Sequence, residues 1–312
     1  MKRLLCLLLV VLAGQAAAED FDYRLAAQAV APDVYAFIGR TEDFTTDNGG
    51  NIVNTAFIVA PQGIIVIDSG PSLRYGQQMR RAIAQVSDKP VVLVINTHHH
   101  PDHFLGNQAF ADVPIGALAD TRQGIVSEGN AFAENLYRMS GDWLKGTEVQ
   151  VPNRMLSAGK LEVAGRTLRL VALDGHTGAD LVVIDETSGV LFAGDLLFNG
   201  RAPTTPHADV GHWLAALDRL EALTRDNGVK ALVPGHGMVT RDAAPIRQTR
   251  AWLNWLTATL RDSARAGLDM NDVLARPLPP EYAALPMAAT EYRRSVGHLF
   301  PAFEQQVLES GR

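Results

Sequence analysis

The feature that most constrains this chain is the segment Thr97-His98-His99-His100-Pro101-Asp102-His103. It follows an apolar run at residues 91–95, which is typical of a buried strand. A strand that ends in this segment brings four polar side chains into a small volume: His98, His100, Asp102 and His103. Neutral imidazoles and carboxylates are ligands that zinc accepts, so the segment predicts a metal site.

The spacing within the segment separates these side chains into two groups. His98 and His100 are two residues apart, so they point the same way if the backbone is extended. Asp102 and His103 follow Pro101 and can turn toward a second metal. The alternative interpretation is a polar loop with solvated histidines, and the rest of the chain disfavours it.

Three more metal-competent residues follow apolar runs later in the chain, namely His176, Asp195 and His236. Each is flanked by glycine, which lets the backbone approach a site closely. A single histidine after a strand is more often structural than a ligand. Four strand ends with donor residues in one chain instead favour convergence on one pocket.

The first eighteen residues have the pattern of a secretory signal peptide. Lys2 and Arg3 precede an apolar run at 4–13, and Ala16-Ala17-Ala18 offers a cleavage site. Cleavage after Ala18 removes two of the 28 basic residues and none of the 34 acidic ones, so the mature net charge is −8 with histidine neutral. We therefore expect a periplasmic or secreted protein with no membrane anchor in its mature form.

Composition excludes two kinds of site. Cleavage also removes Cys6, the one cysteine of the chain, so no metal ligand of the mature protein is a thiolate. The acidic balance without basic clusters argues against nucleic acid, whose phosphates need concentrated lysine and arginine. We expect a small-molecule substrate as the partner.

The periodicity predicts an α+β protein with two sheets faced by helices. We expect a catalytic domain at 19–240 and a helical extension at 241–312 packed on it. The expected strands are 33–38, 54–59, 63–67, 91–95, 113–118, two within 160–173, 181–184, 190–193 and 232–233. The expected helices are 73–86, 104–110, 120–144, 212–223 and 243–266, followed by a tail interrupted by prolines.

These motifs resemble the metallo-β-lactamase superfamily, whose pattern is H-x-H-x-D-H, then G-H-T, G-D and G-H. The chain has all four in order within about residues 33–240. The resemblance implies an αββα sandwich of two mixed sheets. It also implies two zinc ions with these ligands: His98, His100 and His176 for the first, Asp102, His103 and His236 for the second, and Asp195 as a bridge.

The same resemblance implies a function. A metal-bound hydroxide, oriented by Asp102, would cleave an ester, thioester, lactone or amide. The extended segment T-H-H-H-P-D-H-F-L-G-N, the signal peptide and the helical tail are similar to periplasmic zinc hydrolases associated with quinoprotein systems.

Three other functions stay open at this point. A β-lactamase suits export, but some of its subclasses lack the bridging aspartate, so Asp195 argues against it. A persulfide dioxygenase would hold one iron at the first position in place of zinc. A non-catalytic accessory protein would not need to keep all seven donor residues.

Several nearby residues carry weaker expectations. Asp68, at the end of a predicted strand, is expected either to accept a hydrogen bond from a ligand imidazole or to be an exposed strand cap. Arg201 is a candidate for a substrate carboxylate or an ordinary loop arginine, and the loop at 41–51 with Phe44 is a candidate flap or a plain surface loop. His99 is expected to point away from the metals. Three histidines are expected to be structural or solvated: His207, His212 and His298.

Overall fold

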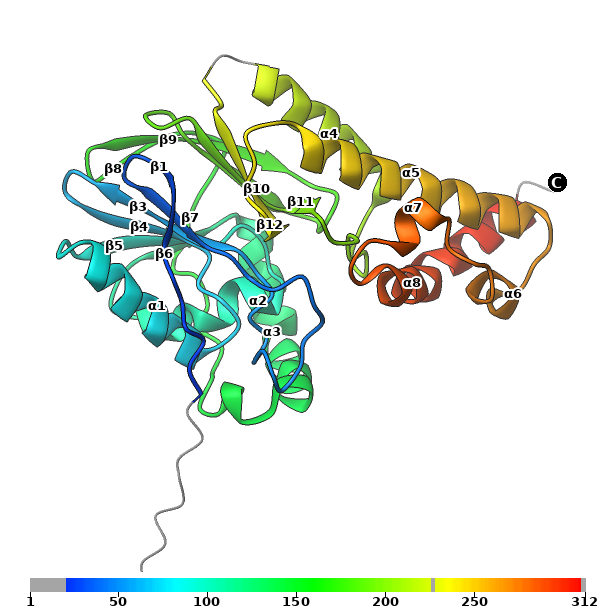
Figure 1. The fold of residues 1–312 in the computed structure, drawn as a ribbon, viewed down its shortest axis with the longest axis horizontal. Coiled ribbons are helices and arrows are strands. Elements are labelled where there is room, and N and C mark those ends of the chain that lie inside the picture. The colour runs from blue at the N-terminus through cyan, green and yellow to red at the C-terminus, as the bar shows by residue number, and fades with distance from the viewer. Residues whose placement is uncertain (1–20, 226–227, 310–312) are drawn as a thin grey trace, which may run out of the picture.

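The structure of the protein is a computed structural model that describes residues 21–225 and 228–309. Two mixed β-sheets pack face to face, and helices cover the outer face of each (Figure 1). The predicted α+β sandwich is confirmed. The predicted signal peptide at 1–18 lies outside the described residues. Within them, no helix combines the length and the apolar character needed to cross a membrane.

The first sheet has seven strands, which lie in chain order. They are β1 (Gln28–Ala31), β2 (Val34–Phe37), β3 (Thr55–Ala60), β4 (Gly63–Ile67), β5 (Val91–Ile95), β6 (Ile115–Ala117) and β7 (Arg154–Met155). The first four strands pair antiparallel, and β4 through β7 pair parallel. The pairing changes from antiparallel to parallel between β4 and β5 because a helix connects these two strands, as the sequence predicted.

The second sheet has five strands in the order β12-β11-β10-β9-β8. They are β8 (Gly159–Val163), β9 (Arg166–Leu173), β10 (Asp180–Asp185), β11 (Val190–Asn199) and β12 (Ala231–Gly237). β11 and β12 are parallel, and the other pairs are antiparallel.

The helices lie in two groups (Figure 1). On the side of the first sheet are α1 (Leu73–Val86), α2 (Pro101–Phe104), α3 (Ala119–Ser140) and the short 3-10 helices η1 (Leu105–Phe110) and η2 (Gly141–Leu144). On the side of the second sheet are α4 (Val210–Arg225) and α5 (Ala244–Arg265), followed by α6 (Met270–Leu274), α7 (Pro280–Ala283) and α8 (Ala288–Glu309).

The alternation within β4 shows why the fold has four layers. Every residue of this strand is buried, yet alternate side chains face opposite ways. Ile65 and Ile67 join the core between the two sheets, whereas Ile64 and Val66 join the core under α1. A strand buried on both faces reads as a continuous apolar run, which is how β4 and β5 appear in the sequence.

β11 and β12 extend well beyond their predicted ends at 193 and 233. Gly194 has a φ of 53°, and the pairing of β11 with β12 shifts register on either side of it. This bulge lets β11 continue as a strand to Asn199. The expectation that Asp195 and His236 follow their strands was therefore wrong, because both lie within irregular extensions of the strands.

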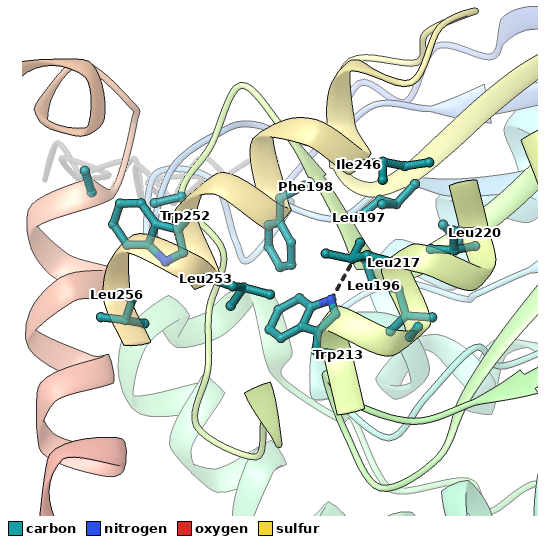
Figure 2. Packing of buried hydrophobic residues seen from close by; sticks show 14 of the residues in the cluster. Leu196, Leu197, Phe198, Trp213, Leu217, Leu220, Ile246, Trp252, Leu253 and Leu256 are labelled. Carbon is teal, nitrogen blue, oxygen red and sulfur yellow. Dashed lines mark hydrogen bonds between the residues drawn. The ribbon is translucent and has the colours of Figure 1, made fainter. Parts of the chain in front are cut away.

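The C-terminal segment completes the outer layer of the second sheet. Figure 2 shows Phe198 of β11 between α5 and Trp213 of α4. The indole N–H of Trp213 donates a hydrogen bond to the Leu196 carbonyl at 3.0 Å. Trp252 and Leu256 of α5 are fully buried in the same core. Helix α5 thus packs directly against the strand that carries Asp195.

We expect Leu217→Ala to lower the free energy of unfolding by about 2–5 kcal/mol, since it opens a cavity in this core. Leu217 is fully buried, whereas Leu308 of α8 is 75% exposed and offers a matched control. Urea unfolding of both variants measures the difference. A loss for Leu308→Ala as large as that for Leu217→Ala would contradict the packing described.

Candidate metal centre

The seven predicted donor residues converge at one end of the sandwich. His98 and His100 follow β5, Asp102 and His103 begin α2, His176 follows β9, and Asp195 and His236 lie in β11 and β12. All seven are buried. Their donor atoms form two clusters, each within 4.8 Å: His98, His100, His176 and Asp195 in one, and Asp102, His103 and His236 in the other.

Asp195 lies between the two clusters. Its Oδ2 atom is 3.3 Å from His176 Nε2 and 3.2 Å from His236 Nε2, and its Oδ1 atom is 3.0 Å from His103 Nε2. One carboxylate thus faces donors from both groups. This is the geometry that a bridging ligand requires.

Asp68 fixes the orientation of two imidazoles. Its carboxylate accepts hydrogen bonds from His103 Nδ1 and from the Thr97 hydroxyl, both at 2.8 Å. Because the Thr97 hydroxyl donates to Asp68, it accepts from His98 Nδ1 at 3.0 Å. Both rings therefore carry a proton on Nδ1, and their Nε2 atoms face the cluster. Of the two expectations for Asp68, the structure shows the buried hydrogen-bond acceptor.

His236 also carries a proton on Nδ1, because this N–H donates to the Ile52 carbonyl at 2.7 Å. Its ring stacks on Phe198 at 5.1 Å between centroids. His98 Nε2 is buried without a hydrogen-bond partner among the described residues, and His103 Nε2 faces only the Asp195 carboxylate, at 3.0 Å. Buried ring nitrogens that face other donor atoms are costly unless they bind something, so this donor set fits a pair of metal ions.

Burial sets the charge of the first cluster. It lowers the pKa of His98 and of His100 well below the usual range, and lowers the pKa of His176 to about 3. Burial alone would lower the pKa of His103 too, but Asp195, Asp68 and Asp102 together raise it well above its ordinary value. The three imidazoles of the first cluster are therefore neutral at neutral pH and can bind a cation.

Glycine is required at two positions beside these ligands. A Cβ atom on Gly235 would lie 1.9 Å from Asp195 Oδ1, so any side chain there displaces the carboxylate. Gly175 has a φ of 138°, and a Cβ there would lie 2.3 Å from the Trp213 Cα atom. The glycines that flank the donors in the sequence thus make room for Asp195 and for the turn that presents His176.

The clusters open into a cavity of about 260 Å³. Asp102, Asp195 and His236 line it on the metal side. Its apolar lining includes Phe44 from the loop at 41–51 and Phe132 from α3. The candidate flap loop therefore contributes to the pocket wall.

Two of the basic residues that line this cavity were not predicted from the sequence. His207, expected to be structural or solvated, lies with Nδ1 2.8 Å from His100 Nε2. Arg294 of α8 also lines the cavity. Neither has a sequence signal, because one lies in an irregular loop and the other in a helix far along the chain.

The remaining histidines that the sequence analysis considered are of two kinds, one buried near the cavity and two exposed. His99 is largely buried beside α3, and its ring lies 5.5 Å from that of His207. With His100, these two residues form a third group of potential donors that the sequence did not suggest. His212 is exposed and pairs with Asp174, and His298 is exposed on α8, as expected for solvated residues.

A family model described as the metallo-beta-lactamase superfamily matches residues 48–236, more than half of the chain and all seven donor positions. The chain is 24% identical over 297 residues to a linear primary-alkylsulfatase from a Pseudomonas species, covering 77% of this chain and 53% of that protein. It is 25% identical over 209 residues to an acyl-coenzyme A thioesterase from Homo sapiens, covering 60% and 74%. A hydroxyacylglutathione hydrolase from a Nostoc species is 25% identical over 148 residues, covering 45% and 49%. The chain thus spans about half the length of two of these relatives.

Solved structures share the fold. A metallo-beta-lactamase from Pontibacter korlensis superimposes with a TM-score of 0.59 at 21% identity, covering 74% of this chain and 99% of that one. One from Hirschia baltica gives 0.58 at 17% identity, covering 73% and 97%. At these identities the likeness establishes the architecture of two mixed sheets faced by helices.

We expect Asp68→Asn to weaken metal binding about 10–100-fold, because an amide cannot accept hydrogen bonds in the way a carboxylate does from both Thr97 and His103. Chelator competition with the metal-loaded protein measures the affinity. Asp120→Asn, an exposed aspartate at the start of α3, is the control. Unchanged affinity in Asp68→Asn would contradict the role of this carboxylate.

In the metal-free protein, His98, His100 and His176 should stay neutral at pH 5. His212 should take up its proton at a higher pH than these three rings, because its hydrogen bond with Asp174 raises its pKa. Each depressed imidazole makes the free energy of unfolding fall as pH drops below about 6.5, since only the unfolded chain then takes up that proton. Histidine ring NMR titration measures these states. Protonation of all three buried rings between pH 7 and 6 would contradict their burial.

Proposed function

The chain belongs to the metallo-beta-lactamase superfamily, and on that premise we propose that it is an exported, periplasmic dizinc hydrolase. Its substrate would be an ester, thioester, lactone or amide. One observation carries the proposal: Asp195 lies within 3.3 Å of imidazoles from both donor clusters. The location is proposed from the sequence of residues 1–18.

The donor set supports zinc in both positions. His98, His100 and His176 would hold one ion, Asp102, His103 and His236 the other, and Asp195 both. Two such ions, when bound, lower the pKa of a shared water and polarise the bond to be cleaved. Iron accepts the same nitrogen and oxygen donors, so a mononuclear iron dioxygenase is the competing proposal.

Asp102 is the residue we place in catalysis. It lines the cavity, and its Oδ2 atom is 3.5 Å from His236 Nε2 and 3.9 Å from His103 Nε2. Burial raises the pKa of its carboxyl, which favours proton acceptance. In this position the carboxylate would orient the attacking water and accept its proton, while the cavity wall positions the substrate.

The relatives support cleavage of an ester or thioester bond. They are named as an alkylsulfatase, an acyl-coenzyme A thioesterase and a hydroxyacylglutathione hydrolase. The solved neighbours are titled metallo-beta-lactamases, but their likeness carries the fold alone. Asp195 between the clusters favours the first group of activities over β-lactam hydrolysis.

We expect about two zinc ions per chain by elemental analysis, and turnover of at least one member of a panel of small esters, thioesters, lactones and amides. Asp102→Asn should lower kcat by at least 100-fold with little change in thermal unfolding, and Asp120→Asn should leave kcat unchanged. One iron per chain with oxygen uptake on a persulfide would instead support the dioxygenase. Hydrolysis of a cephalosporin alone would support the β-lactamase. Full activity in Asp102→Asn would refute its role.

A further inference from the structure

Arg201 is a buried cation with weak contacts. It lies in the loop after β11, is 2% exposed and lines the same cavity as Asp102 and Asp195. Its Nη2 atom is 3.3 Å from Glu291 Oε1 and 3.5 Å from the Glu42 carbonyl, and its Nη1 atom is 3.4 Å from the Ala202 carbonyl. Its Nε atom has no hydrogen-bond partner within the described residues. A guanidinium offers five N–H donors, so this one is poorly satisfied for its burial.

The nearest carboxylate is already engaged by other groups. Glu291 of α8 is fully buried, accepts from Thr204 Oγ1 at 2.7 Å and from Arg294 Nη1 at 2.9 Å. Its contact with Arg201 is the longest of the three. Arg294 in turn holds Asp43 through two hydrogen bonds of 3.0 and 2.7 Å. Glu291 therefore fixes the place of Arg201 while leaving donor capacity for another anion.

The position of Arg201 connects it to the metal centre. Its Cζ atom lies 5.8 Å from the centroid of the Phe198 ring, and the same ring stacks on His236. Phe198 thus contacts both the guanidinium and a donor imidazole. Phe44 and Phe132 add apolar surface to the same cavity.

We propose that Arg201 binds an anionic oxygen group, a carboxylate or a sulfate, on a substrate whose remaining part is short and apolar. The proposal rests on the hydrolase function above and specifies its substrate class. A volume of about 260 Å³ is at the small end for ligand pockets, which limits the apolar part to a few carbons. Helix α8, which lies outside the segment matched by the family model, sets this preference through Glu291.

The test compares three probes of equal chain length, hexanoate, hexyl sulfate and hexanol, by calorimetric titration of the metal-loaded full chain. We expect at least one anion to bind ten-fold or more tightly than hexanol. Arg201→Met should remove at least ten-fold of the anion affinity and leave hexanol unchanged, because only the charge-assisted hydrogen bonds are lost. Arg293→Gln, at an exposed arginine of α8, is the control for net charge.

The substitution Glu291→Gln is expected to change the anion affinity in the opposite direction. It removes the negative charge that competes for Arg201, so anion affinity should rise at least three-fold while hexanol binding stays the same. A purely structural role for this ion pair predicts weaker binding of all three probes. Thermal unfolding of each variant shows that the titrated protein is folded, since an unpaired buried arginine lowers stability.

The outcomes separate the two proposals. Anion affinity that is unchanged in Arg201→Met would mean that the metals alone bind the probes, and would overturn this inference. Equal binding of hexanol and both anions would also overturn it. Arg201-dependent anion binding without turnover of any ester, thioester, lactone or amide would keep the binding site and refute the hydrolase. A preference for hexanoate or for hexyl sulfate identifies which anion the site takes.

Discussion

The hydrogen bonds of Asp68 are the interaction on which the site depends. Asp68 directly follows β4 and has a left-handed backbone conformation, with a φ of 56°, which is uncommon for a residue with a side chain. In this position it accepts from the Thr97 amide and hydroxyl and from His103. Through Thr97 it also fixes His98. A single residue just after β4 thus orients one donor of each cluster.

Much of the fold follows from local patterns in the sequence. The hairpin of β3 and β4, the crossover through α1 and the long helix α5 were predicted within a few residues, because their apolar spacing has one structural solution. β1 and β7 were not predicted. β1 alternates little in polarity, and β7 is only two residues long, so neither carries a pattern that exceeds that of a loop.

The site, too, contains some residues that local sequence patterns predict and others that they do not. His98, His100, Asp102 and His103 are close in sequence, and the strand before them forces them together, so their convergence needs no tertiary information. The course of β11 past Gly194 depends on pairing with β12, and no local pattern reveals it. His207, Arg201 and Arg294 reach the cavity only because the loop after β11 and the helix α8 fold over it. Sequence motifs therefore identify the donor residues, whereas the walls that surround them come from contacts between distant segments.

The donors come from both sheets, and this has a consequence for how the protein matures. His98 and His103 follow β5 of the first sheet, whereas Asp195 and His236 lie in strands of the second, so neither cluster exists until the two sheets have met. In either cluster the full donor set therefore forms only in a chain that is already folded, in whatever compartment folding takes place. A metal ion that needs the full donor set of a cluster would therefore bind after the two sheets have packed together. Once bound, it would tie one sheet to the other.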